Sequence, residues 1–118
     1  MNSRRTALVV DDDPSTRLLL EKFLVRKGFH VDVAEHGGEA MTRLQARDYG
    51  VIMLDLMMPV LDGHAVLAFL RKENPSLLDR VVVVTAYPGP LSSTELGVRA
   101  VVSKPFTFDL LSNVLESV

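Results

Sequence analysis

Three aspartates each follow a short hydrophobic stretch, where a carboxylate can do chemistry at the end of a sheet. Asp11 and Asp12 come directly after the apolar residues 7–10, and Asp55 comes directly after Val51–Leu54. Runs of this kind are typical of central strands that are buried on both faces. Ligands of an open parallel sheet bind beyond the carboxyl ends of the strands, where the strand order reverses. If the two strands are neighbours, three carboxylates share one crevice.

Two more polar side chains follow apolar strands later in the chain. Thr85 comes after residues 81–84, and Lys104 comes shortly after residues 100–102. Like charges in one crevice disfavour ionisation unless a cation joins them, and hard carboxylate oxygens with no cysteine nearby favour Mg²⁺. A carboxylate beside Mg²⁺, a lysine and a hydroxyl can attack a phosphoryl group and become an aspartyl phosphate. These residue types therefore predict a phosphoryl-transfer site.

The bulk composition excludes several classes of protein. The chain has 118 residues and a formal net charge of −2, so it fits one domain and lacks the basic face that nucleic acid requires. The absence of cysteine excludes disulfides and thiol catalysis. No apolar run approaches the roughly 18 residues of a membrane span, and no secretory segment opens the chain. We expect a cytoplasmic protein with no membrane insertion and no direct contact with nucleic acid.

The hydrophobic pattern alternates between strand and helix along the whole chain. The expected strands are Thr6–Val10, His30–Ala34, Val51–Leu54, 81–84 and 100–102. Five β/α units joined by right-handed crossovers give a doubly wound α/β sandwich of three layers. The flavodoxin-like order 2-1-3-4-5 would place the first and third strands side by side at the switch point. This order provides the neighbouring strand ends that the predicted site needs.

Capping residues mark where the helices begin and end. Asp13 before Pro14 predicts an N-cap, and Gly28 predicts the end of that helix. The second helix is marked by Ala40, Met41 and Leu44, beyond a break at Gly37-Gly38. The third is expected at residues 65–72, after a turn shaped by Asp62 with Gly63 and before Asn74-Pro75. The last is capped by Thr107, and one face of it carries Leu111, Val114, Leu115 and Val118.

The fourth helix is expected to be short or irregular. Pro88-Gly89-Pro90 forbids a helix at its start, and Gly97 follows soon after. Residues 91–96 allow at most one to two turns. Elsewhere, Met53, Met57 and Met58 are expected to fill space around the third strand, and the three dispersed histidines, His30, His36 and His64, suggest no metal or phosphotransfer role.

Five sequence blocks occur in an order that matches a known family. They are VVDDDP at 9–14, DLMMP at 55–59, Asp62-Gly63, Thr85-Ala86 and KPF at 104–106. Together these blocks resemble the receiver domain of two-component response regulators, and the resemblance covers essentially residues 1–118 as a single domain. It implies a regulatory module rather than an enzyme with an outside substrate. Its partners would be a sensor histidine kinase or histidine phosphotransfer protein, and a downstream protein or an effector domain outside this chain.

The resemblance also implies a role for each polar residue of the site. Asp55 would accept the phosphoryl group from a phosphohistidine. Asp12 and Asp55 would bind Mg²⁺ directly, together with the backbone carbonyl of Met57. Asp11 would contact the Mg²⁺ ion through water. Thr85 would form a hydrogen bond to the phosphoryl group, and Lys104 would form an ion pair with it. The resemblance also implies that the Lys104–Pro105 peptide bond is cis.

Three departures from the family pattern concern the output of the domain. Val101 stands where receivers usually carry an aromatic side chain that swings inward, and a compact valine cannot make that large rotamer change. The interval between Thr85 and Lys104 is a few residues shorter than usual. The last helix contains no Lys or Arg, which argues against the salt-bridged dimer of DNA-binding relatives. We therefore expect the output to be a contact with another protein, or with an effector domain outside this chain.

The lifetime of a phosphorylated state would depend on two positions. In the family, the residues two after the phosphoacceptor and two after the threonine help to orient the hydrolytic water. Here these residues are Met57 and Tyr87, neither of which is an obvious partner for that water. We expect slow self-dephosphorylation.

Three other functions share parts of this pattern. A degenerate receiver would act by protein binding without phosphorylation, which Val101 and the short fourth helix favour and the intact acidic, Thr and Lys set disfavours. A Mg²⁺ phosphatase would want a second carboxylate two residues after its nucleophile, where this chain has Met57. A flavodoxin-type electron carrier would need a phosphate-binding loop where this chain is acidic.

Overall fold

A five-stranded parallel sheet forms the centre of the computed structural model, which describes residues 5–58, 62–86 and 92–116. The strand order is β2-β1-β3-β4-β5, as the sequence predicts. The strands are β1 (Thr6–Val10), β2 (His30–Ala34), β3 (Val51–Leu54), β4 (Val81–Thr85) and β5 (Ala100–Ser103). The predicted switch point therefore lies between β1 and β3, as expected for a flavodoxin-like fold.

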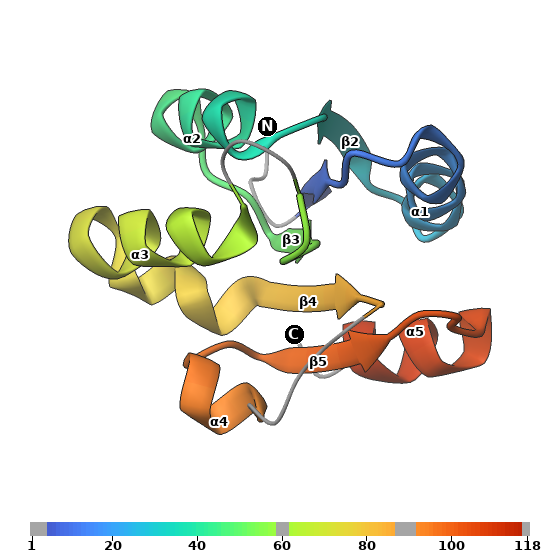
Figure 1. Ribbon diagram of the computed structural model, residues 1–118. Coiled ribbons are helices and arrows are strands. Elements are labelled where there is room, and N and C mark those ends of the chain that lie inside the picture. The colour runs from blue at the N-terminus through green and yellow to red at the C-terminus, as the bar shows by residue number, and fades with distance from the viewer. Residues whose placement is uncertain (1–4, 59–61, 87–91, 117–118) are drawn as a thin grey trace.

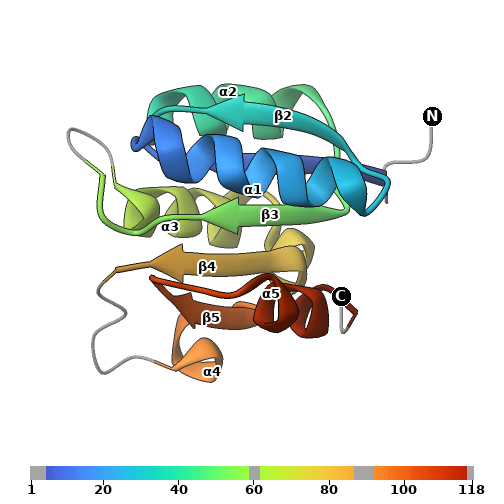
Figure 2. The same cartoon turned by 90° about the vertical axis from the view of Figure 1, so that its right-hand side faces the viewer.

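Helices cover both faces of the sheet and make the predicted three layers (Figures 1 and 2). One face carries α1 (Pro14–Arg26) and α5 (Phe108–Glu116), and the other carries α2 (Gly37–Ala46), α3 (Gly63–Glu73) and α4 (Ser93–Leu96). In the described part of the chain, no helix has the length and apolar character that crossing a membrane requires.

The central strand β3 is buried on both faces, which explains why its sequence is continuously apolar. Val51 and Met53 pack with residues of α1 and α5, whereas Ile52 and Leu54 pack with residues of α2 and α3. All four side chains are at most 1% exposed. The end of β3 is thereby fixed against both helical layers, so the residue that follows has a defined position.

The two predicted N-caps, Asp13 and Thr107, are present, and Asp62, which was expected to shape a turn, is a third. Asp13 accepts a hydrogen bond from the amide of Thr16 before α1, and Asp62 accepts one from Ala65 before α3. The hydroxyl of Thr107 accepts one from Leu110 at the start of α5. These bonds satisfy amides that the helix itself leaves without an acceptor.

Helix α2 begins at Gly37, earlier than the apolar pattern suggested, because a histidine caps it. Nδ1 of His36 accepts a hydrogen bond from the amide of Glu39 at 3.1 Å, and the carboxylate of Glu39 accepts one from the amide of Glu35 at 2.7 Å. The two glycines at 37 and 38 belong to the helix rather than to a loop. His36 thus has a structural role as an N-cap.

The remaining differences concern short elements and one methionine. A 3₁₀ helix, η2 (Pro75–Arg80), follows α3 where the sequence suggested only a helix end. α4 is a single turn, which agrees with the expected short helix, and it is followed by Gly97 in the left-handed region at φ 77°. Pro88-Gly89-Pro90 and Val118 lie outside the described residues. The expectation that Met57 fills space in the core was wrong: its side chain is 60% exposed, whereas Met53 and Met58 are buried.

Candidate functional site

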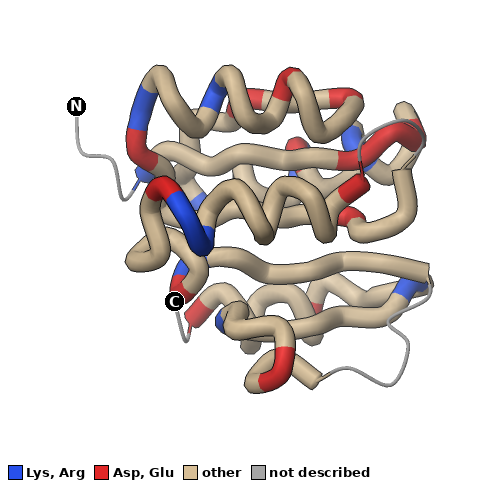
Figure 3. The backbone as a smooth tube through the Cα atoms, turned by 60° about the vertical axis from the view of Figure 1, so that its left-hand side comes forward, with Lys and Arg blue, Asp and Glu red and all other residues tan. Residues whose placement is uncertain are grey.

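The backbone ladder of the sheet continues one residue past the strand ends and holds two of the aspartates. Val10 of β1 is paired with Leu54 of β3, so the residues that follow them emerge side by side. The amide of Asp55 donates to the carbonyl of Val10 at 3.0 Å, and the amide of Asp11 donates to that of Ala34 at 3.1 Å. Figure 3 shows acidic segments at this end of the sheet. The predicted convergence of the two strand ends is therefore present.

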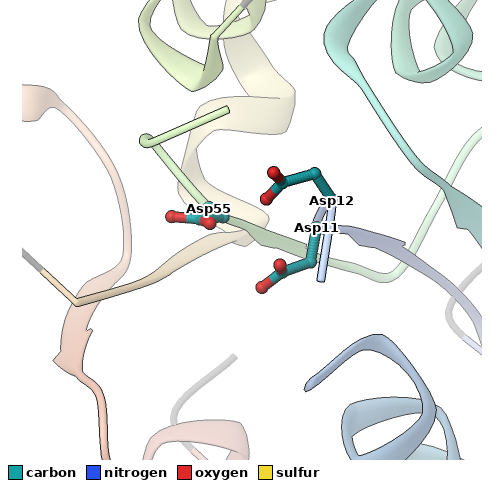
Figure 4. A group of neighbouring side chains, drawn as sticks. All are labelled: Asp11, Asp12 and Asp55. Atoms are coloured by element: carbon teal, nitrogen blue, oxygen red, sulfur yellow. The ribbon is translucent and has the colours of Figure 1, made fainter. Parts of the chain in front are cut away.

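Three carboxylates meet at these strand ends (Figure 4). One oxygen each from Asp11, Asp12 and Asp55 lies within 4.8 Å of the others. Asp11 and Asp55 are only 1% and 5% exposed, whereas Asp12 is exposed. The Asp11 carboxylate accepts from the amide of Asp13 at 2.9 Å, and the Asp55 carboxylate accepts from the amide of Met57 at 3.0 Å. The cluster is thus preorganised, with one face open to solvent.

Lys104 joins the cluster from the last strand. Its amide donates to the carbonyl of Thr85 at 2.9 Å, which places it just past the paired ends of β4 and β5. Its Nζ lies 2.8 Å from Oδ2 of Asp11 and 3.4 Å from Oδ2 of Asp55. The Lys104–Pro105 bond that follows is cis, as the family resemblance implied. One ammonium group therefore bridges two buried carboxylates.

Burial and pairing act in opposite directions on the ionisation of this ion pair. Burial raises the pKa of Asp11, and hydrogen bonds from Lys104 and from the amide of Asp13 offset only part of that effect. Burial would lower the pKa of Lys104, but its hydrogen bond to Asp11 and the charges of Asp11 and Asp55 outweigh it and leave the pKa raised. The ammonium form of Lys104 is thus favoured. The pKa of Asp11 stays raised in spite of this partner, so a further cation beside the carboxylates would stabilise their ionised form.

Thr85 ends β4 with a buried hydroxyl. The residue is 0% exposed, and its Oγ1 makes no hydrogen bond within the described chain. A buried polar group without a partner costs free energy and calls for an explanation, such as an absent ion or ligand. The hydroxyl is available to a ligand that brings an acceptor oxygen to the strand end.

Gly63, which the sequence suggested only as a turn residue, packs against the backbone that carries Asp55. A Cβ placed on Gly63 would lie 2.3 Å from the carbonyl oxygen of Asp55 and 2.8 Å from Cα of Leu56. The amide of Gly63 donates to the carbonyl of Leu56 at 3.2 Å. A side chain at this position would push the start of α3 away from Asp55, so glycine is required by close approach.

Arg17 contacts the acidic loop, although no sequence pattern singled it out. Its Nη1 donates to the backbone carbonyl of Asp11 at 2.8 Å, and its Nη2 lies 3.4 Å from a carboxylate oxygen of Glu35. The Arg17 side chain is only 15% exposed. A helix position six residues after the contacted aspartate gives no signal that a sequence pattern could detect.

A largely apolar hollow of about 460 Å³ adjoins Lys104 on the side of α1. It is bounded by α1 and by the residues that follow β4 and β5. Its lining residues are Thr16, Leu19, Ala86, Lys104, Pro105 and Phe106. The cluster therefore borders a recess that can receive part of another molecule.

The model of the response regulator receiver domain matches residues 7–116. The chain belongs to this family. Receiver domains are regulatory modules of two-component signalling that accept phosphoryl groups and interact with kinases and downstream effectors. The family assignment agrees with the resemblance that the five sequence blocks carried.

Individual relatives cover the receiver chain almost completely. A probable transcriptional regulator of Cyanophora paradoxa, ycf27, is 36% identical over 89% of this chain and 44% of its own length. The response regulator TrrA of Thermotoga maritima, solved in complex with Mg²⁺-BeF, has a TM-score of 0.83 and 32% identity over 96% of this chain and 97% of that one. The chemotaxis protein CheY4 of Vibrio cholerae has a TM-score of 0.84 and 28% identity over 96% and 97%. The chain spans about half the length of the curated relatives that it matches.

Proposed function

We propose that Asp55 accepts a phosphoryl group from a phosphohistidine and that the modified domain switches a contact with another protein. The observation that carries this proposal is the bridge made by Lys104. Its Nζ reaches both Asp11 and Asp55, which lie with Asp12 in one cluster at neighbouring strand ends. No requirement of core packing explains this arrangement, because buried carboxylates are costly.

The three carboxylates fit a hard divalent cation. Two of them are buried, one is exposed, and all three present an oxygen to the same small region. We propose that Asp12, Asp55 and the backbone carbonyl of Met57 would hold Mg²⁺, with Asp11 acting through water. Such an ion, when bound, supplies positive charge that neutralises phosphoryl oxygens. The relative TrrA was solved in complex with Mg²⁺-BeF, which supports the choice of this ion.

The chain's own residues can carry out the transfer. A carboxylate oxygen of Asp55 attacks the phosphorus of the donor, the N–P bond breaks, and the imidazole leaves with the electron pair of that bond. The amide of Met57 and Nζ of Lys104 already hold Asp55 in one orientation. Lys104 and the unpartnered hydroxyl of Thr85 can then stabilise oxygens of the transferred group.

The phosphodonor must approach from the open side of the site. We propose that part of a sensor kinase or histidine phosphotransfer protein enters the hollow beside Lys104. Because such kinases use ATP, this partner also supports a cytoplasmic location. We propose that residues 1–118 form one receiver domain that has no outside substrate. Its downstream partner would be another protein, or an effector domain outside these residues.

Dephosphorylation is expected to be slow. Met57 presents a 60% exposed thioether side chain beside Asp55, and a thioether is a poor hydrogen-bonding partner for a hydrolytic water. The second position implicated by the sequence, Tyr87, lies outside the described residues. The half-life of the acyl phosphate at neutral pH tests this expectation, and a value of seconds would contradict it.

A receiver that acts without phosphorylation is the second candidate. It is favoured by the single turn of α4 and by Val101, which is half-buried and packed against the core, so that the aromatic switch of the family is absent. The complete set of polar residues at the strand ends favours the phosphorylated switch instead.

Labelling with a small phosphodonor separates the two functions. The chain is incubated with acetyl phosphate with and without Mg²⁺, and incorporation of one phosphoryl group is followed by intact-protein mass spectrometry. We expect Mg²⁺-dependent labelling that Asp55→Asn abolishes. Asp62→Asn is the matched control, because asparagine retains the N-cap of α3 and position 62 lies outside the cluster. Equal labelling of Asp55→Asn and the unmodified chain would refute the assignment of Asp55.

A further inference from the structure

We propose that Arg17 is a positioning residue that orients Asp12 for the divalent cation. This inference rests on the proposed Mg²⁺ site and assigns a role to a residue outside the acid, threonine and lysine set. Its guanidinium contacts the backbone of the acidic loop rather than any carboxylate of the cluster.

The three carboxylates are held unequally. Asp11 is fixed by the amide of Asp13 and by Lys104, and Asp55 is fixed by the amide of Met57 and by Lys104. The Asp12 side chain is exposed, and the described residues offer its carboxylate no hydrogen bond. The direction of this carboxylate therefore depends on the backbone that carries it.

Arg17 holds that backbone. The carbonyl of Asp11 and the amide of Asp12 belong to one planar peptide group, so a bond to the oxygen at one end restricts the orientation of the other. Nη1 of Arg17 donates to this oxygen at 2.8 Å, from a side chain that is 15% exposed. The amide of Asp11 is fixed to Ala34 of β2 at 3.1 Å. The sheet thus fixes the Val10–Asp11 peptide, and α1 holds the Asp11–Asp12 peptide that follows it.

The contact to Glu35 carries less weight than the contact to the peptide. The ion pair is 3.4 Å long and its Glu35 carboxylate is 68% exposed, so solvent competes with it. Its removal should leave the bond from Arg17 to the loop intact. Glu35 therefore provides a control that alters the charge around Arg17 without releasing the peptide.

The sign of the effect separates positioning from simple electrostatics. Arg17 is a cation near a site for another cation, so its charge alone opposes binding of Mg²⁺, and its removal would strengthen binding. A positioning role predicts the reverse, because the released loop no longer presents Asp12. Loss of residues that orient metal ligands typically weakens metal affinity by about 10- to 100-fold.

Titration of the folded chain with MgCl₂, followed by isothermal calorimetry, tests the inference. We expect Arg17→Met to raise the dissociation constant about tenfold, the lower end of that range because the contact is to backbone. Arg17→Lys keeps the charge and can reach one acceptor, so it should fall between Arg17→Met and the unmodified chain. Glu35→Gln should bind within about twofold of the unmodified chain. Urea unfolding in the presence of EDTA measures the stability of each variant separately.

Unchanged or tighter binding of Mg²⁺ by Arg17→Met would overturn the inference, even if that variant were less stable. If Arg17→Met does not fold, Arg17→Lys decides, and binding equal to the unmodified chain would overturn it in the same way. If the unmodified chain binds no Mg²⁺, the proposed metal site fails and the role of Arg17 fails with it. A loss confined to the Arg17 variants supports the inference.

Discussion

Replacement of Gly63 by alanine should damage both stability and phosphoryl transfer, although the added group is a single methyl. The new Cβ would lie 2.3 Å from the carbonyl oxygen of Asp55, and relief of this contact requires the start of α3 and the Asp55–Leu56 backbone to separate by about 1 Å. Overpacking of this kind costs about 1–3 kcal/mol, and we expect the upper end because both contacts are to backbone. A displacement of that size at a reacting group can also slow the reaction about 100-fold.

Gly38 provides a matched control for the same substitution. An added Cβ there would meet only the side chain of His36, at 3.3 Å, and Gly38 lies in the first turn of α2. Alanine has a higher helix propensity than glycine. The free energy of unfolding of Gly38→Ala should therefore be higher than that of the unmodified chain or within about 0.5 kcal/mol of it. The two variants differ in what surrounds the methyl group and not in the residues exchanged.

Urea unfolding in EDTA and the rate of labelling by acetyl phosphate measure the two effects. We expect Gly63→Ala to lose about 3 kcal/mol of unfolding free energy and to label much more slowly than Gly38→Ala. If Gly63→Ala were as stable as the unmodified chain and labelled at the same rate, the close approach of α3 to Asp55 would not constrain the site.

Two further substitutions test buried hydroxyls. Thr85→Val keeps a β-branched side chain but removes the hydroxyl that has no partner in the described chain. The free energy of unfolding of the metal-free chain should therefore rise by about 1 kcal/mol, while labelling by acetyl phosphate slows. A loss of stability would show that the hydroxyl has a partner in solution. Burial, followed by the hydrogen bond to Asp32, raises the pKa of Tyr49. As the pH rises, this tyrosine therefore ionises in the unfolded chain before it ionises in the folded chain. The stability that the neutral tyrosine contributes is complete below about pH 10, and above it is lost at up to about 1.4 kcal/mol per pH unit. Tyr49→Phe should lack this part of the alkaline loss in urea unfolding measured from pH 7 to 11, and an equally steep loss in both chains would contradict the assignment.

The sequence was sufficient for the sheet and for the polar residues that end its strands. Apolar runs such as Val51–Leu54 identify buried strands, and the residue after each run is placed by the topology alone. Caps such as Asp13 and Thr107 were predictable because their hydrogen bonds are local in sequence.

Two contacts made to the backbone of the acidic site could not be predicted. Arg17 binds the loop through a backbone carbonyl, and every residue offers such an acceptor, so residue type gives no signal. The requirement for Gly63 arises from the distance between α3 and the end of β3, which local pattern does not encode. The exposure of Met57 was missed because its thioether side chain matches the composition of the adjoining buried strand.

The bridge from Lys104 to Asp11 joins groups that are 93 positions apart in the chain. A ribosome must therefore release nearly the whole domain before the ammonium group can reach the first strand. Until β5 docks beside β4, the nascent polypeptide holds its acidic side chains without their counter-charge. The bridged cluster thus forms only after β5 has been synthesised and docked, and a product truncated before Lys104 would lack it.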